Sequence, residues 1–277
     1  MLATETFLAI FIFSFVPLAI KFTAANPFTI GFFRLLVASS LSFIFWRRKI
    51  HPGLFLQKES WRLILLGLVF FCHWITYFYS IKIAGPSVCV LGMSTYGIQL
   101  IFFGSVFLGY HVKRKNITAL ILVLLGITQL IPEWNFSNNF TQGIALALLS
   151  ASFYACLPIL HQKTNQYFDH DIRIFSQFFF GLTGFSFFAT KTSWVLTNKD
   201  WYALIFLAVF GTFIAHTLWA RVTSKLPTTT SGIIYYAITP SALILSHFLL
   251  GESLTTKQII AAGLILSGAL YNSLKTT

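Results

Sequence analysis

Residues 61–109 read WRLILLGLVFFCHWITYFYSIKIAGPSVCVLGMSTYGIQLIFFGSVFLG, and Arg62 and Lys82 are their only charged side chains. The pair Gly85-Pro86 divides this stretch into two apolar runs. An α-helix needs roughly 20 apolar residues to cross a bilayer, and each run comes close to that length. The stretch therefore predicts two consecutive membrane-spanning helices, at 61–82 and 86–109.

Further apolar runs of similar length lie on both sides of this stretch, separated by charges and by clusters of proline, glycine and asparagine. Together they predict an all-α integral membrane protein with ten transmembrane helices. We expect these helices at residues 5–22, 28–46, 61–82, 86–109, 116–132, 142–161, 172–190, 201–221, 227–249 and 257–273.

The composition supports a chain dissolved in lipid, with 9% charged residues, 56% hydrophobic residues and a mean hydropathy of +0.77. A soluble domain normally carries about a quarter of its residues as charged side chains. This composition excludes a soluble enzyme. The net charge of +12 would indicate a nucleic-acid partner in a soluble protein, but here we assign it to membrane orientation, and we expect no nucleic-acid partner.

Basic residues are distributed unequally between the two sets of loops. With the N-terminus inside, thirteen basic residues fall in inner loops and five in outer loops, and the positive-inside rule then places both termini in the cytoplasm. The short loops and the Phe-rich, Ile-rich and Lys-rich composition indicate a bacterial inner membrane. The thirteen are Arg47, Arg48, Lys49, Lys58, Arg62, Lys113, Arg114, Lys115, Lys163, Arg173, Arg221, Lys225 and Lys275, and the five are Lys21, Lys82, Lys191, Lys199 and Lys257.

The two halves of the chain resemble each other at an offset of about 142 residues. At this offset Pro17 corresponds to Pro158 and His73 to His216, and further pairs are Lys21 with Lys163, Lys82 with Lys225, Pro86 with Pro227, Gly109 with Gly251 and Gly126 with Gly268. We therefore predict two repeats, at 1–136 and 137–277. Because five helices is an odd number, the second repeat enters the membrane from the opposite side. Inverted repeats around a central cavity are typical of alternating-access transporters.

The end of the second half resembles a known family in Ile238-Thr239-Pro240, in Leu249-Leu250-Gly251-Glu252, and in Lys257-Gln258, Gly263 and Gly268. These residues are similar to the end of an EamA repeat, which typifies the drug/metabolite transporter (DMT) superfamily. The resemblance implies a ten-helix fold with a central cavity and a role in moving small metabolites, often outward.

The first half resembles the same repeat less closely. Asn26-Pro27 leading to Arg34, and Ser80-Ile81-Lys82, match its second and third helices. Tyr110-His111 stands where Gly-Glu is usual, and Tyr96-Gly97 replaces the usual Thr-Pro. Because of these departures, the substrates of better-known members cannot be assigned to this chain.

His73 and His216 stand near the middle of two predicted spans, at corresponding positions of the two repeats. Under the inverted symmetry they should lie on opposite walls of one cavity. An imidazole there can hydrogen-bond a substrate or carry a proton at near-neutral pH. A neutral histidine satisfied by a neighbouring helix is the alternative interpretation.

Arg34 is the only arginine that lies away from the ends of the predicted spans, and no acidic residue lies near the middle of the membrane to pair with it. Such a group must be paired, or aimed at water or an anion. Two interpretations stay open. Arg34 attracts a carboxylate or phosphate of the substrate, or it caps carbonyls freed near Pro17; its match to the arginine usual in the family favours a structural role.

Polar aromatic side chains gather on the helices that we expect to line the cavity. Stacking and cation–π contacts from such side chains suit a flat or cationic solute. Each of them could equally serve packing. Of the cluster Trp74, Tyr77, Tyr96, Trp219, Tyr235 and Tyr236, we take Trp74, Tyr77, Tyr96, Trp219 and Tyr236 as candidates for the cavity wall.

Three further residues are candidates for the transport machinery. Gln99 is a buried amide that either faces the cavity or joins two helices. Pro17 and Pro158 each leave a helix carbonyl unpaired, which suits a gating kink in the first helix of each repeat, or a static bend.

The sequence thus predicts a secondary transporter for a small polar or aromatic metabolite, such as an amino acid, a purine-like base or an amphipathic cation, working by alternating access as exporter or exchanger. We expect no enzymatic activity, no cofactor and no metal site; the partners are the substrate and membrane lipid, in a monomer or homodimer. Two alternatives are a passive channel or lipid scramblase, and a membrane protein holding haem between His73 and His216.

Overall fold

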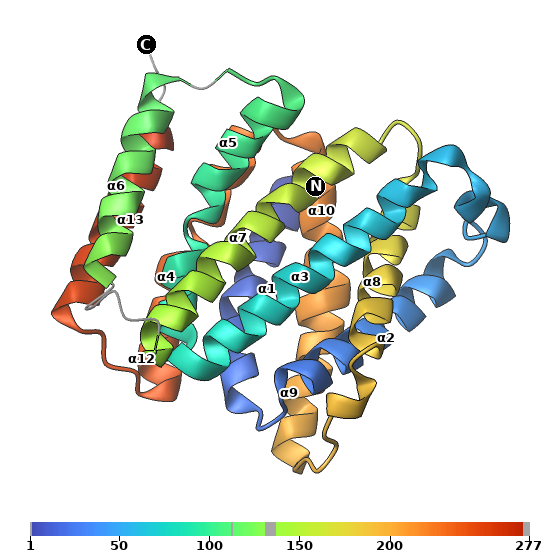
Figure 1. The fold of residues 1–277 in the computed structure, drawn as a ribbon, viewed down its shortest axis with the longest axis horizontal. Coiled ribbons are helices and arrows are strands. Elements are labelled where there is room, and N and C mark those ends of the chain that lie inside the picture. The colour runs from blue at the N-terminus through green and yellow to red at the C-terminus, as the bar shows by residue number, and fades with distance from the viewer. Residues whose placement is uncertain (1, 112, 131–136, 274–277) are drawn as a thin grey trace.

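The computed structural model describes residues 2–111, 113–130 and 137–273. Within this part of the chain, α-helices joined by short connections make up the molecule, and no strand forms. Figure 1 shows the helices packed side by side as one bundle.

The helices of the first half extend from residue 2 to residue 130. They are α1 (Leu2–Phe22), α2 (Pro27–Trp46), α3 (Trp61–Ala84), α4 (Pro86–Met93), α5 (Tyr96–Leu108) and α6 (Arg114–Leu130). Two short 3₁₀ helices, η1 (Pro52–Leu56) and η2 (Lys58–Ser60), lie in the connection between α2 and α3 and were not predicted.

The helices of the second half follow the same order. They are α7 (Asn139–Thr164), α8 (His170–Ser186), the short η3 (Ala189–Lys191), α9 (Asn198–Ala208), the π-helix η4 (Val209–Ile214), α10 (Ala215–Lys225), α11 (Thr228–Tyr235), α12 (Ile238–Leu250) and α13 (Thr256–Ser273). The predicted boundary between residues 136 and 137 falls at residues 131–136, which lie outside the described part of the chain.

Seven helical segments are long and apolar enough to cross a membrane, so the chain is an integral membrane protein. The other predicted spans, at 116–132, 172–190 and 257–273, correspond to α6, α8 and α13, which are not among these seven. The seven are Leu2–Phe22, Pro27–Trp46, Lys58–Ala84, Pro86–Leu108, Asn139–Thr164, Asn198–Lys225 and Thr228–Leu250.

The predicted span 86–109 is broken between α4 and α5, at Ser94 and Thr95. The Ser94 hydroxyl donates to the carbonyl of Val90 (2.9 Å), and the Thr95 hydroxyl donates to that of Gly92 (2.8 Å). Serine and threonine side chains bonded to nearby carbonyls compete with the helical pattern and bend it. The break therefore has a local cause in the sequence.

The predicted span 227–249 is broken at the corresponding place, between α11 and α12 at Tyr236 and Ala237. Proline at position 240 has no amide hydrogen for the carbonyl of Tyr236, and its ring crowds that carbonyl. The Thr239 amide bonds the Tyr236 carbonyl instead (3.2 Å). The two halves thus break at positions 142 residues apart for different local reasons.

The segment 198–225 changes to a π-helix in its middle, at η4. The Thr212 hydroxyl donates to the carbonyl of Leu207, five residues earlier (2.7 Å). Single π-turns inside α-helices occur frequently at functional sites. The predicted continuous helix at 201–221 is therefore three elements, and the π-helix turns Gly211 and Thr212 toward the bundle interior, where both are buried.

The central elements pack across the two halves. Helix α3 packs on α7 and α8, α1 packs on α10 and α12, and α5 packs on α7 and α11. Helices α6 and α13 pack mainly on each other at one edge of the bundle (Figure 1). The centre of the molecule is therefore formed by α1, α3, α7, α10 and the broken helices.

Helices α5 and α11 approach each other closely at Gly97 and Gly232. A Cβ atom at Gly97 would lie 2.6 Å from the Tyr236 ring and 2.9 Å from the carbonyl oxygen of Gly232. Only glycine fits a contact in which backbone meets backbone, as in other tightly packed membrane helices. This crossing fixes the distance between the two broken helices beside the centre of the bundle.

We predict that Gly97→Ala destabilises the protein by about 1–3 kcal/mol, because the added methyl group overpacks the crossing. Gly263→Ala is the matched control, since a Cβ there meets no atom within 4 Å. Thermal unfolding in detergent, followed by tryptophan fluorescence, compares the two. A Gly97→Ala protein as stable as the wild type would contradict this view of the crossing.

Candidate functional site

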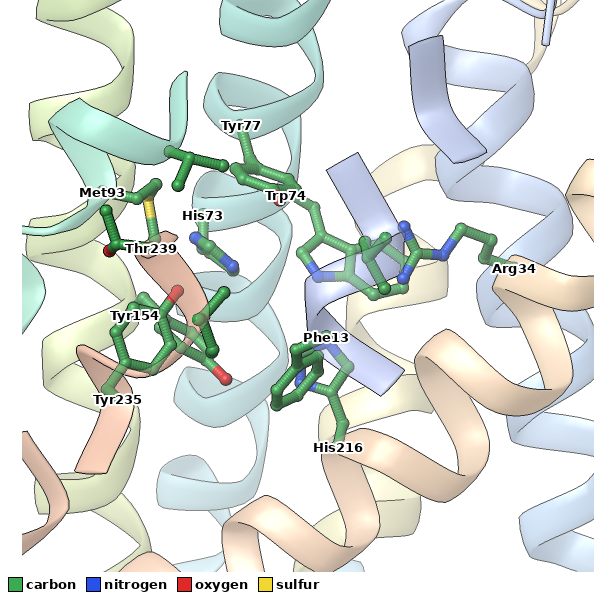
Figure 2. A pocket seen from close by; sticks show the side chains of 13 residues that line it. Phe13, Arg34, His73, Trp74, Tyr77, Met93, Tyr154, His216, Tyr235 and Thr239 are labelled. Carbon is green, nitrogen blue, oxygen red and sulfur yellow. The ribbon is translucent and has the colours of Figure 1, made fainter. Parts of the chain in front are cut away.

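A cavity lies at the centre of the bundle, between the two halves (Figure 2). The first half contributes Phe13, Val16, Arg34, His73, Trp74, Tyr77, Val90 and Met93, and the second half contributes Tyr154, His216, Tyr235, Ile238 and Thr239.

The cavity is small in this conformation. The space open to the centre of a water molecule is about 40 Å³. A volume of that size admits a few water molecules and no metabolite. Binding a larger solute therefore requires the surrounding helices to separate.

His73 is held in one orientation by α7. Its Nδ1 lies 2.8 Å from the Ser150 hydroxyl and 3.1 Å from the Ser150 carbonyl, and that hydroxyl donates to the His73 carbonyl (2.9 Å). A carbonyl can only accept, so Nδ1 carries the proton. In the neutral ring Nε2 is then left as a hydrogen-bond acceptor on the cavity side.

His216 reaches the same cavity from α10. Its ring packs edge-on against Phe13 (4.9 Å between ring centroids) and Phe70 (4.8 Å), and it makes no side-chain hydrogen bond to another described residue. His73 is 4% exposed and His216 is 6% exposed. Both imidazoles therefore face the protein interior rather than lipid, and Figure 2 shows them approaching the cavity from different helices.

Arg34 crosses from α2 to the π-helix of the second half. Its Nε donates to the Thr212 hydroxyl (2.9 Å), and Nη2 donates to the Gly211 carbonyl (3.2 Å). The guanidinium lies over the Trp74 ring, 4.1 Å from its centroid. The carbonyl it caps thus belongs to η4, rather than to the turn of α1 that Pro17 disrupts.

Aromatic rings form the remaining wall. The Tyr154 ring stacks on His73 (4.4 Å) and lies 5.7 Å from the Tyr235 ring. Tyr77 lies 5.6 Å from His73 on the same face of α3. The wall therefore offers flat surfaces with hydroxyl tips, which suit a planar solute.

Five of the residues predicted for the cavity line it, namely Arg34, His73, Trp74, Tyr77 and His216. Four others do not reach its wall. Tyr96 and Trp219 lie behind Tyr235, with ring centroids 4.3 Å and 6.0 Å from it, and Tyr236 packs on Gly97. Gln99 joins helices instead, since its amide donates to Thr95 (2.9 Å) and to the Leu148 carbonyl of α7 (3.4 Å).

Two aromatic wall residues missed by sequence reasoning, Phe13 and Tyr154, stand at matching positions of the two halves. Each lies four residues before a proline, Pro17 in α1 and Pro158 in α7. Proline leaves the carbonyl four residues earlier without its helical partner. The repeat offset applied to the residues before each proline would have found this pair. Tyr235, which belongs to the aromatic cluster but is not among the predicted wall candidates, also lines the wall, and Met93 is its match at the repeat offset. Val16, Val90, Ile238 and Thr239 carry no comparable signal.

Haem does not fit between the two histidines. The space in this conformation is far smaller than a planar macrocycle needs. Within the described residues no three His, Cys, Asp or Glu side chains gather closely enough to hold a metal ion.

The model of the EamA-like transporter family matches the chain twice, over residues 3–131 and 141–274. The chain belongs to this family. It therefore contains two EamA repeats and is an integral membrane transporter of the drug/metabolite transporter superfamily, whose EamA members are transporters rather than enzymes.

A solved crystal structure of a protein has a fold similar to that of this chain. It aligns with a TM-score of 0.73 and 18% sequence identity, covering 98% of this chain and 97% of that chain. No curated protein sequence matches this EamA chain.

We predict that Thr212→Val destabilises the protein by about 1–3 kcal/mol, because Nε of Arg34 loses its acceptor while it stays buried. Thr223→Val is the matched control, because its buried hydroxyl bonds only carbonyls of its own helix. Thermal unfolding of both variants in the same detergent makes the comparison. Equal midpoints for the two variants would show that the contact with Arg34 contributes no stability.

Proposed function

We propose that this EamA protein is a secondary transporter that moves a small polar or aromatic metabolite across a bacterial inner membrane by alternating access. The observation that carries the proposal is that matching positions of the two repeats line one cavity. Phe13 corresponds to Tyr154, His73 to His216 and Met93 to Tyr235. Both repeats therefore contact the same solute, and each repeat can close one side of the cavity.

Contacts near the helix ends support the predicted ten crossings with both termini in the cytoplasm. Lys49 pairs with Asp171 at 2.5 Å, and Arg221 pairs with Glu5 at 3.2 Å; all four lie on the side predicted to be cytoplasmic. The bond to Asp171 raises the pKa of Lys49. Asn26, by contrast, donates to the Lys191 carbonyl (3.0 Å) on the side predicted to be external.

The directions of α1 and α7 support an inverted second repeat. Near its start, at Glu5, α1 meets Arg221 close to the end of α10 (3.2 Å). Near its end, at Gln162, α7 meets the Thr223 carbonyl of the same turn (2.9 Å). The start of one helix and the end of the other therefore share a side, so the first helices of the two repeats run in opposite directions.

The two prolines are suited to opposite gates. Pro17 lies near the end of α1, and Pro158 lies near the end of α7. Because the two helices run in opposite directions, the prolines weaken opposite ends of the cavity wall. A kink at one would then open the cavity to one side while the other stays closed. This arrangement serves an exporter and an exchanger equally.

A passive channel or scramblase is the second candidate, but the centre of the bundle does not form an open path in this conformation. The small central space and the rings packed around it instead fit a closed intermediate of a transport cycle. Saturation and counterflow separate these classes, because a channel shows neither.

We predict that the double variant His73→Gln/His216→Gln lowers uptake into proteoliposomes at least about tenfold, because the solute loses hydrogen bonds from both walls. The probes are labelled aromatic amino acids, purine bases, nucleosides and quaternary ammonium cations, tested by counterflow. His247→Gln is the control, since this histidine is exposed at the end of α12.

Unchanged uptake by the double variant would remove the histidines from the mechanism. Permeation by the wild type without saturation or counterflow would favour a passive pore.

A further inference from the structure

Arg34 carries a buried positive charge, and one of its three guanidinium nitrogens makes no hydrogen bond to a described residue. The residue is 1% exposed, and Nε and Nη2 are taken by Thr212 and Gly211. Its third nitrogen, Nη1, is buried and has no hydrogen-bond partner among the described residues. Because Arg34 lines the central cavity, this free nitrogen marks a place where a ligand atom could accept a hydrogen bond.

A second buried arginine shows what a purely structural guanidinium looks like in this protein. Arg173 is also 1% exposed, and all three of its nitrogens are bonded. Nε donates to the Phe168 carbonyl (3.1 Å), Nη1 to the His161 carbonyl (2.6 Å) and Nη2 to Asn165 (2.7 Å). Arg173, which is counted above among the basic residues of the inner loops, is buried against the turn that joins α7 to α8. Arg34 differs from Arg173 in two ways: its Nη1 has no hydrogen-bond partner among the described residues, and it lines a cavity.

The charge of Arg34 has no counter-ion in the described part of the chain. No carboxylate lines the cavity. The described acids that make polar contacts do so elsewhere: Glu5 with Arg221, Asp169 and Asp171 with Lys49, Asp200 with Thr197 and the Ala24 amide, and Glu252 with Ser87. An unpaired charge inside a membrane protein is costly, and an anionic ligand would offset that cost.

The chemistry around Arg34 selects the kind of anion. A guanidinium fork matches the geometry of a carboxylate, and its stacking on Trp74 fixes the plane of that fork. Beyond Trp74 lie the flat rings of Tyr154 and Tyr235 and the acceptor Nε2 of His73 (Figure 2). A solute with a planar ring and a carboxylate would fit this arrangement. Its carboxylate would bind Arg34, and its ring would pack against Tyr154 and Tyr235.

We propose that the transported solute is an aromatic carboxylate whose acid group binds Nη1 of Arg34. This inference rests on the proposed transport function and narrows its substrate class, because it sets aside amphipathic cations and uncharged bases. Since the closed cavity admits only water, the solute enters after the helices around Arg34 and Trp74 separate.

The test uses solutes of one size that differ in charge or planarity. 3-Phenylpropionate, 3-phenylpropionamide and 3-phenylpropylamine share a carbon skeleton, and 3-cyclohexylpropionate keeps the acid but loses the flat ring. Binding to the purified protein is measured by thermal shift and tryptophan fluorescence. Chloride and phosphate serve as inorganic anions. We expect phenylpropionate to bind at least about tenfold more tightly than each of the others.

Two variants assign the preference to one residue. Arg34→Gln should bring the carboxylate-to-amide ratio of affinities close to one. Arg173→Gln should leave that ratio unchanged, although it removes an equally buried arginine. Should Arg34→Gln fail to fold, the comparison of solutes on the wild type still decides the question.

The inference is overturned if the amide or the amine binds the wild type as tightly as the carboxylate, if chloride or phosphate matches it, or if none of the solutes binds. Proteoliposome uptake keeps the two proposals apart. Carrier-mediated uptake of the amine but not the acid would reject the carboxylate and leave the transporter intact. Absence of saturable uptake for every solute, despite tight carboxylate binding, would reject transport instead.

Discussion

The bond from Arg34 to the π-helix is the interaction on which the rest of the centre depends. It joins α2 of the first repeat to η4 of the second, deep in the bundle, through Gly211 and Thr212. The π-turn presents both acceptors to one guanidinium, because an ordinary α-helix would retain that carbonyl for its own hydrogen bonds. The same turn precedes His216 in the chain, so the element that holds the arginine also directs the histidine into the cavity.

Close packing around this contact keeps the cavity small. The glycine crossing of α5 and α11 brings the two broken helices together, while Phe13 and Tyr154 line the cavity. Three pairs of wall residues stand at matching positions of the two repeats, and only His73 and His216 are the same residue. Phe13 corresponds to Tyr154 and Met93 to Tyr235, while no described arginine of the second repeat lines the cavity to match Arg34. If a solute binds here as proposed, this asymmetry favours one orientation of that solute.

Much of the architecture could be predicted from the sequence, because lipid imposes a strong rule on helix length and on the side chains a helix exposes. The repeat offset likewise paired His73 with His216, and both line the cavity. The breaks at Ser94 and Tyr236 were missed, since apolar periodicity does not register a turn made by hydroxyl groups or by a later proline. Tyr96, Gln99, Trp219 and Tyr236 were expected at the wall and lie elsewhere, because being on the right helix does not decide which face a side chain occupies.

The proposed opposite orientation of the two EamA repeats can be tested most directly at their matched glycine caps. Gly109 and Gly251 end α5 and α12 with φ of 72° and 67°, in the left-handed region that favours glycine. In a protein without its native cysteines, His111→Cys and Ser253→Cys place one thiol at the same step beyond each cap. A membrane-impermeant maleimide should label position 253 in intact cells and position 111 only after permeabilisation. Labelling of both positions from the same side would contradict the inverted arrangement and, with it, the shared alternating cavity.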